Sequence, residues 1–180
     1  MAWTRKDVKD LFFSSVIWNP RGFYPEEYDE LAEHLSVGWV VVETQGYVVP
    51  PAPAEDSPWH RWYQHLMWEG SQSDAHKELK WAALNWIVAQ GDTMPDEEYR
   101  ANFGRPDVVG RQLRLVAECG DTPPSKVVAA LMGGWNAFTL WPFDKQTVFI
   151  FRLSDEGRKE LTTLFQRRLF ANNAAGMVGL

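Results

Sequence analysis

The stretch RPDVVGRQLRLVAECGD, residues 105–121, carries one carboxylate in each of two short apolar runs, Asp107 in the first and Glu118 in the second. Two carboxylates that meet in an apolar setting repel each other and lose hydration unless a cation lies between them. Mg²⁺ is commonly held by one or two carboxylates, with water and phosphate oxygens completing its shell. A metal ion held in this way can make hydroxide from water and stabilise charge on a phosphodiester. The pair therefore points to metal-assisted chemistry at phosphate.

Two neighbouring strands must position these acids. Residues two apart in a strand share a face, so Glu118 is expected to share a face with Arg114, Val116 and Gly120. A short turn near residues 110–112 predicts that the two strands pair antiparallel. Asp107 and Glu118 are then expected to approach each other at the end of the pair remote from the turn.

The rest of the chain from residue 73 onward predicts an alternation of helices and strands. The expected order is helix, strand, strand, strand, helix, strand, strand, helix, over residues 73–91, 94–103, 106–110, 112–119, 122–134, 137–143, 146–153 and 154–170. This order is typical of an α/β or α+β fold with a mixed sheet flanked by helices.

The N-terminal part of the chain has a different pattern. Helical spacing predicts helices over residues 4–17 and 24–35, and two β-branched runs around TQG predict a hairpin over residues 38–50. A Pro-rich segment follows and suggests a boundary. We therefore expect residues 1–57 to form a helix–helix–hairpin extension or a small winged-helix-like module. Residues 58–170 would form the core, and residues 171–180 a flexible tail.

The acids and the predicted order of elements resemble those of the PD-(D/E)XK nuclease superfamily, which has the restriction-endonuclease-like fold. The resemblance covers residues 73–143. It rests on the dipeptide Pro106–Asp107, on Glu118 in the next strand, and on the order α-β-β-β-α-β. An acid upstream, Glu98 or Glu97, is similar to the glutamate that many members carry on the first core strand or helix.

The resemblance implies roles for particular residues. Glu98, Asp107 and Glu118 would bind Mg²⁺ or Mn²⁺ as cofactor. The family's lysine stands two residues after the second acid, where this chain has Gly120. Such a lysine positions water and offsets transition-state charge. Relocated lysines occur in the superfamily, so the expected substitutes are Lys126 in the following helix and, second, Lys80.

Further polar residues flank this predicted site. His76 and Lys80 lie one turn apart on one helix face in HKELK. Arginines near the acids would meet phosphates. They are Arg100, Arg105, Arg111 and Arg114.

These observations leave three functions open. The first is a metal-dependent nuclease that acts on DNA or RNA in DNA processing, defence or mobile-element biology. The second is a catalytically degenerate, nuclease-fold module that binds a protein partner. The third is an acidic inhibitor-type partner of a protein complex. The net charge of −6 argues against nucleic-acid binding by the whole surface but leaves room for a local site.

Structural explanations compete with each of these roles. Asp107 after a proline could begin a strand as a turn residue, and Glu118 could cap the next helix. The remaining candidates could be solvated surface residues, namely Glu97, Glu98, His76, Lys80 and Lys126. The ten tryptophans fit either a core or a partner-binding surface, a homodimer included. An aromatic cluster could stack bases or pack on the helix over residues 73–91; its members are Trp59, Trp62, Tyr63 and Trp68.

Composition and motif content exclude several other kinds of site and of protein. The single cysteine, Cys119, gives no disulfide framework or thiolate zinc site, and strand alternation places it in the core. Neither a phosphate-binding Gly-rich loop nor a dinucleotide-binding motif is present. No apolar run approaches the length of a membrane span, and the N-terminus lacks a signal-peptide pattern. We therefore expect a cytoplasmic protein without membrane contact.

Overall fold

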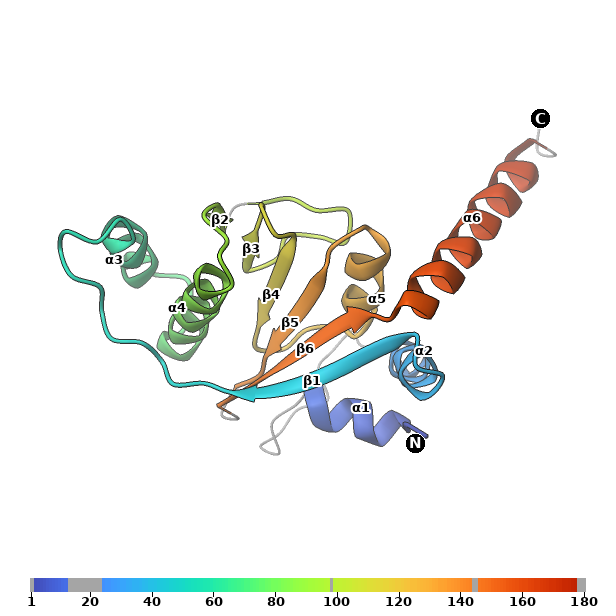
Figure 1. Cartoon of the computed structure of the whole chain (residues 1–180), viewed down its shortest axis with the longest axis horizontal. Coiled ribbons are helices and arrows are strands. Elements are labelled where there is room, and N and C mark those ends of the chain that lie inside the picture. Colours follow the sequence, from blue (N-terminus) through green and yellow to red (C-terminus); the bar gives the residue numbers. More distant parts are fainter. Residues whose placement is uncertain (1, 13–23, 98, 144–145, 178–180) are drawn as a thin grey trace.

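The computed structural model describes residues 2–12, 24–97, 99–143 and 146–177 (Figure 1). The helices are α1 (Arg5–Phe12), α2 (Pro25–Ser36), α3 (His60–Trp68), α4 (Asp74–Ala89), α5 (Ser125–Met132) and α6 (Asp155–Met177). The strands are β1 (Val40–Gly46), β2 (Pro95–Asp96), β3 (Val108–Gly110), β4 (Leu115–Cys119), β5 (Ala137–Trp141) and β6 (Thr147–Leu153).

The strands form one six-stranded mixed sheet, in the order β1-β6-β5-β4-β3-β2. Strands β4 and β5 pair in parallel, and every other neighbouring pair is antiparallel. The parallel pair requires a crossover, and α5 supplies it. The expected mixed sheet with flanking helices, in the predicted order from residue 73 onward, is confirmed.

Helices cover both faces of the sheet, because strand residues alternate between two apolar clusters. Val109 and Val116 pack with residues of α1, α2 and α5 on one face. Val108, Ala117 and Cys119 pack with residues of α3 and α4 on the other. The β3–β4 pair is therefore buried on both faces, and an acid at its end is shielded from bulk water.

The helix that lies closest to the predicted site has clear termini. The Ser73 side chain accepts a hydrogen bond from the backbone N–H of His76 and caps α4. Gly91 follows the C-cap residue with a positive φ of 100°, which a residue with a Cβ rarely adopts. Both ends agree with the sequence signals.

The N-terminal hairpin prediction is wrong. Only the first β-branched run forms a strand, β1, and it pairs antiparallel with β6 over Val40–Leu153 to Gly46–Thr147. The second run, at Tyr47, Val48 and Val49, does not form a strand. The edge of an existing sheet offers a full set of backbone partners, which an isolated two-stranded hairpin lacks.

Three other boundaries differ from the sequence expectation. The strand expected over residues 94–103 is only Pro95–Asp96. The tail expected from residue 171 continues α6 as far as Met177. The first helix is described from Arg5 to Phe12, and the rest of its expected span lies outside the described residues.

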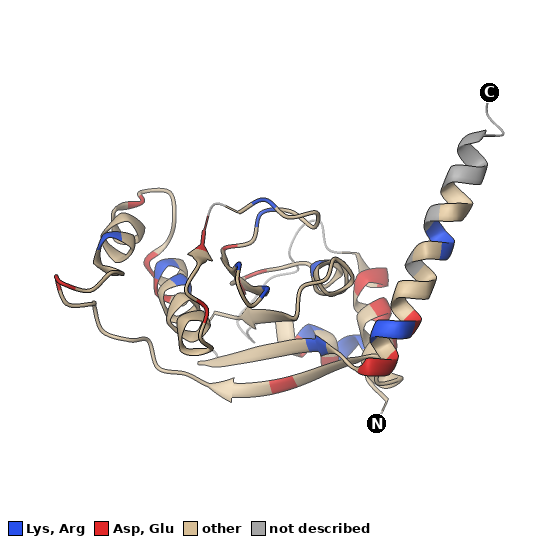
Figure 2. Ribbon diagram, turned by 45° about the horizontal axis from the view of Figure 1, so that its top comes forward, with Lys and Arg blue, Asp and Glu red and all other residues tan. Residues whose placement is uncertain are grey.

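Charged residues of both signs lie mainly on helices and connecting loops, and few lie on the strands (Figure 2). Within the described ranges, no helix combines the length and apolar character needed to cross a membrane.

Candidate active site

The pairing of β3 with β4 brings the two predicted acids together. Val108 pairs with Ala117, so the next positions outward are Asp107 and Glu118. The negative charge of Asp107 acts on the Glu118 carboxyl group, so the two acids interact. They meet at the end of the pair remote from the turn, as the alternation predicts.

Two groups from opposite directions hold Asp107. Its Oδ1 lies 3.0 Å from Nε2 of His76 in α4, and its Oδ2 accepts a hydrogen bond of 2.8 Å from the backbone N–H of Cys119. Burial alone would raise the pKa of Asp107. The hydrogen bonds from His76 and Cys119, with the positive charges of His76 and Lys80, outweigh burial and leave that pKa below its usual range. Asp107 is therefore the ionised member of the pair.

Glu118 is more deeply buried, with 4% of its surface exposed. Its Oε1 accepts a hydrogen bond of 2.7 Å from Nζ of Lys126, which lies in the first turn of α5. Burial and the negative charge of Asp107 raise the pKa of Glu118 to about 7, although Lys126 acts in the opposite direction. One acid of the pair is thus held ionised, while its neighbour titrates near neutral pH.

Gly120 has a physical reason to lack a side chain. Its φ of 83° lies in the left-handed region, and a Cβ built there would approach Cε2 of Phe143 to 2.4 Å. The Phe143 ring also lies edge-on to the His76 ring, with centroids 6.4 Å apart. A lysine at position 120 would therefore collide with an aromatic ring that packs on the site. The ammonium group beside Glu118 comes from Lys126 instead.

A hollow of about 240 Å³ opens beside Asp107. Its lining residues are Glu69, Gln72, Lys80, Glu97, Arg105, Pro106 and Asp107. Glu97 Oε2 lies 3.3 Å from Nζ of Lys80, and Glu97 Oε1 lies 3.4 Å from Nε2 of His65. Lys80 is 4% exposed, so it is not a solvated surface residue. The hollow therefore contains a buried cation between two carboxylates.

One buried oxygen in this hollow, Oε1 of Gln72, lacks a hydrogen-bond donor among the described atoms. Oε2 of Glu97 makes no hydrogen bond of good geometry either, but it is ion-paired with Lys80. Buried acceptors are normally satisfied, so the Gln72 oxygen indicates room for a bound donor. The carboxylate and amide oxygens around Asp107 are the hard ligands that Mg²⁺ and Mn²⁺ accept.

The metal prediction itself remains an expectation. Within the described ranges, no three side chains of His, Cys, Asp or Glu converge closely enough to hold one ion. Asp107 and Glu118 alone form a pair of acids that fits an ion with several water ligands, which is how Mg²⁺ is usually bound. Glu98 lies outside the described residues.

Three of the four predicted arginines lie in two places, and Arg100 is exposed in the segment between β2 and β3. Arg105 lines the hollow beside Asp107. Arg114 was expected on the same strand face as Glu118, and this is wrong. Arg114 lies in the turn with a φ of 55°, and its guanidinium group donates to the backbone carbonyl of Gly134. Arg111 lies at the same turn, 3.8 Å from the Asp96 carboxylate.

The structural alternative for Glu118 is also resolved by its contacts. Glu118 pairs with a side chain and does not cap α5, whose N-cap residue is Pro124. Cys119 is buried against α4, and burial raises the pKa of its thiol well above the usual value. The expectation that Cys119 belongs to the core is confirmed.

Sequence reasoning missed several parts of this site. Phe143 lies far along the chain from Gly120, and no local pattern connects them. Glu69 and Gln72 come from the segment between α3 and α4 and carry no motif. His65 could have been noticed, because helical spacing places it on one polar stripe of α3 with Arg61 and Gln64.

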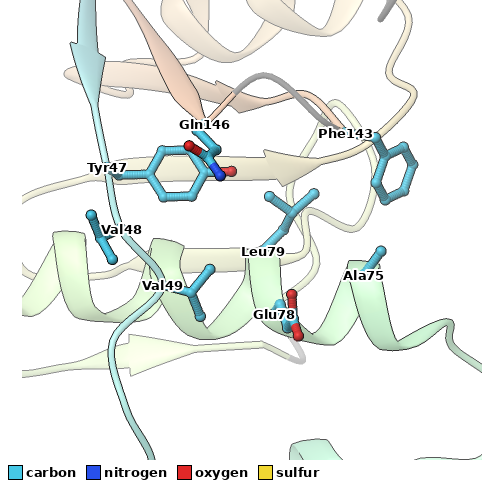
Figure 3. A pocket seen from close by; sticks show the side chains of 8 residues that line it. All are labelled: Tyr47, Val48, Val49, Ala75, Glu78, Leu79, Phe143 and Gln146. Carbon is cyan, nitrogen blue, oxygen red and sulfur yellow. The ribbon is translucent and has the colours of Figure 1, made fainter. Parts of the chain in front are cut away.

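A second hollow, of about 390 Å³, lies between α4 and the segment that follows β1 (Figure 3). Tyr47, Val48 and Val49 line one side of it, and Leu79 lines another. Phe143 borders this hollow and also packs at Gly120. The second hollow therefore adjoins the candidate site but contains neither of its acids.

Comparisons of this chain with protein-family models, with curated proteins and with solved structures found no match.

Proposed function

We propose that the chain is a divalent-metal-dependent nuclease of the PD-(D/E)XK type, which hydrolyses phosphodiester bonds in DNA or RNA. One observation carries the proposal. A partly buried carboxyl group, Asp107, and a buried one, Glu118, meet at the end of an antiparallel strand pair, and a lysine ammonium lies 2.7 Å from the Glu118 carboxylate. Two acids and a lysine are the groups that metal-assisted hydrolysis of a phosphodiester requires.

The two acids are the proposed ligands of Mg²⁺ or Mn²⁺. The ion, when bound, would lower the pKa of a water ligand and offset negative charge on the phosphate. Burial and, after it, the negative charge of Asp107 raise the pKa of Glu118 to about 7, and a cation brought to this pair would oppose both effects. Glu98 stays a candidate third ligand from the sequence, and Glu97 is the acid that lines the hollow beside Asp107.

The proposed role of Lys126 is to stabilise developing charge or to orient the attacking water. It reaches Glu118 from α5, and so it replaces the lysine that Gly120 cannot carry. His76 is a positioning residue, because its contact with Oδ1 fixes the Asp107 carboxylate. Lys80 and Arg105 border the same hollow and are the proposed phosphate contacts.

A second candidate is a binding module of the same fold that does not cut. It is favoured by the charge pairing within the site, since Lys126 already neutralises Glu118 and His76 already contacts Asp107. A cluster satisfied by its own side chains can persist as structure alone. The acidic, inhibitor-type partner role is a variant of this candidate.

The test is a cleavage assay on supercoiled plasmid, linear duplex, single-stranded DNA and RNA, with Mg²⁺ or Mn²⁺ and with EDTA. We expect metal-dependent cleavage that falls by more than about 100-fold in Glu118→Ala and Glu118→Gln, since even loss of a residue that supports a metal ligand costs about 10–100-fold. Asp92→Asn is the matched control, because Asp92 is another buried acid but lies outside the site.

Equal cleavage by the wild type and Glu118→Gln would assign the activity to a contaminant and reject the proposal. Calorimetric titration with Mn²⁺ separates the two candidates. The nuclease proposal expects heat of binding that Glu118→Gln abolishes, whereas the binding module expects none in either protein.

A further inference from the structure

Helix α3 has two different faces. Leu66 is fully buried, and Trp62 and Tyr63 pack beside Trp81 of α4, with ring centroids 6.2 and 4.9 Å away. The prediction that the aromatic cluster packs on the long helix is therefore confirmed for this face. Trp68 does not take part, since 86% of its surface is exposed.

The opposite face of α3 is solvent-exposed and polar apart from that tryptophan. Arg61, Gln64, His65 and Trp68 occupy positions i, i+3, i+4 and i+7, which form one stripe of a helix, and all four are exposed. They line a hollow of about 310 Å³. We call this set the α3 outer face. A large ring beside cationic and amide groups is a combination that fits a nucleobase with its phosphate.

The α3 outer face adjoins the candidate active site. His65 Nε2 lies 3.4 Å from Oε1 of Glu97, which lines the hollow beside Asp107. Glu69 lines that same hollow and directly follows Trp68. The C-terminal end of α3 is also anchored, because the buried Lys77 of α4 donates a hydrogen bond of 3.0 Å to the backbone carbonyl of Met67. Trp68 is thus exposed on a fixed support that borders the acids.

We propose that the α3 outer face is a stacking platform for an unpaired base, and that it delivers single-stranded nucleic acid to the Asp107–Glu118 site. The identity of the ligand rests on the proposed nuclease function. Trp68 would stack on the base, while Arg61 and His65 would contact the backbone phosphates on the way to Arg105 and Lys80.

Single strands fit this surface better than duplex. In a duplex both faces of each base are covered by neighbouring bases, and an exposed indole has nothing to stack on without disrupting them. The net charge of −6 also disfavours a long duplex footprint, which depends on many phosphate contacts. A short local contact made by stacking, one arginine and one histidine needs less positive surface.

The test measures binding without cleavage. Fluorescence anisotropy of a labelled oligothymidylate is recorded in EDTA for the wild type, Trp68→Ala and Trp68→Phe. We expect Trp68→Ala to weaken binding by about 5- to 150-fold, the equivalent of about 1–3 kcal/mol for one stacked base. Trp68→Phe retains an aromatic face and should keep most of the affinity.

Phe170→Ala is the matched control. Phe170 is also an exposed aromatic residue, at 75%, but it lies on α6 at the opposite end of the molecule (Figure 1). Its removal should leave the affinity unchanged. Arg61→Gln should reduce the slope of log affinity against log salt by about 0.7, the value for one phosphate contact on a single strand.

Three results would overturn the platform: equal affinity of Trp68→Ala and wild type, equal affinity for oligothymidylate and for a duplex of the same length, or no oligonucleotide binding at all. The last would leave a protein partner as the occupant of this face. Cleavage of plasmid by a chain that shows any of these results rejects the platform and keeps the nuclease proposal. Binding through Trp68 without any cleavage supports the platform and rejects the nuclease.

Discussion

The two ends of the β3–β4 pair both contain buried acids, but the acids are held in different ways. At the turn end, Asp92 is 1% exposed, and its two oxygens accept backbone hydrogen bonds of 2.7 Å from Met94 and Leu113. At the other end, Asp107 contacts His76, Glu118 contacts Lys126, and the two acids interact electrostatically with each other. The first arrangement fastens a turn, and the second concentrates titratable groups beside a hollow.

Each end of the pair also contains a glycine, and the missing side chain leaves room for a different group at each end. A Cβ at Gly110 would lie 2.6 Å from Oδ2 of Asp92 and 2.8 Å from Cγ2 of Ile87, so the missing side chain admits the acid itself. At Gly120 the missing side chain admits the ring of Phe143. Backbone amides can neutralise a carboxylate permanently, whereas side-chain cations can exchange with a metal or a substrate. The comparison teaches that burial alone does not identify a functional acid.

The largest effect is expected at Lys126. Lys126→Met removes the only cation within 2.7 Å of Glu118 that the described residues supply. We expect metal-dependent cleavage to fall by about 100- to 1,000-fold, the range for loss of one preorganised charge-stabilising donor. Initial rates on plasmid DNA at saturating Mn²⁺ measure the loss.

Lys126→Arg is the control for this prediction, because it keeps the charge but not the compact ammonium geometry. It should recover part of the rate. If Lys126→Met cleaves as fast as the wild type, the lysine beside Glu118 is structural, and Lys80 becomes the candidate for the catalytic role.

The next largest effect concerns stability against pH in the metal-free protein. The pKa of Glu118 is raised in the folded state to about 7 from an ordinary value of 4.5. The folded state therefore binds this proton more tightly than the unfolded state. The contribution of Glu118 to stability is fully present below about pH 4.5 and is lost as the pH rises through about 7. A shift of this size corresponds to at most about 3 kcal/mol.

Urea denaturation in EDTA at several pH values measures this effect. Glu118→Gln cannot titrate, so the stability difference between wild type and variant should decline between about pH 4.5 and pH 7. A difference that stays constant across that window would mean that Asp107 and Glu118 do not interact as described. Saturating Mn²⁺ should restore the stability of the wild type most strongly above about pH 7, because metal ligands bind in the deprotonated form.

The turn end of the β3–β4 pair, which contains Asp92, should respond in the opposite way. A substitution there should reduce stability and leave cleavage unchanged. Asp92→Asn replaces one acceptor oxygen with an amide and leaves a buried backbone N–H unsatisfied, so we expect a loss of about 1–3 kcal/mol. Urea denaturation at neutral pH checks the stability, and plasmid cleavage checks the activity. Cleavage should stay close to the wild-type rate wherever the variant is folded. A selective loss of cleavage in a stable Asp92→Asn protein would contradict the division between the two ends.

The two ends of the β3–β4 pair could not be predicted equally well from the sequence, and the reason is physical. Alternation within a strand and one short turn are local properties, and they predict that Asp107 lies near Glu118. The helix around His76 and Lys80 was equally clear, because its cap and its Gly91 terminus are local signals. The mixed sheet with flanking helices followed from the order of these local elements.

What the sequence did not reveal depends on contacts between distant segments. The β1 segment was expected to form a hairpin, yet it pairs with β6 at the far end of the chain. The ring of Phe143 against Gly120 and the hydrogen bonds of Asp92 across the turn are of the same kind. Each is decided by tertiary packing, which no window of the sequence contains.

The smallest expected effect is at Gly120. Gly120→Ala places a methyl group on a residue with a φ of 83°, which costs about 1–2 kcal/mol. The atoms that the methyl group meets are Cε2 and Cζ of Phe143, at the far end of a side chain, so the ring can shift and the loss should stay near this range. Cleavage should be retained, because the side-chain chemistry beside Glu118 comes from Lys126. Urea denaturation and plasmid cleavage measured on the same preparation decide the outcome. Loss of cleavage without loss of stability would mean that the packing of Phe143 on Gly120 and His76 is needed to align Asp107. The end of the pair that contains Asp107 and Glu118 would then depend on residues across the sheet, beyond β5.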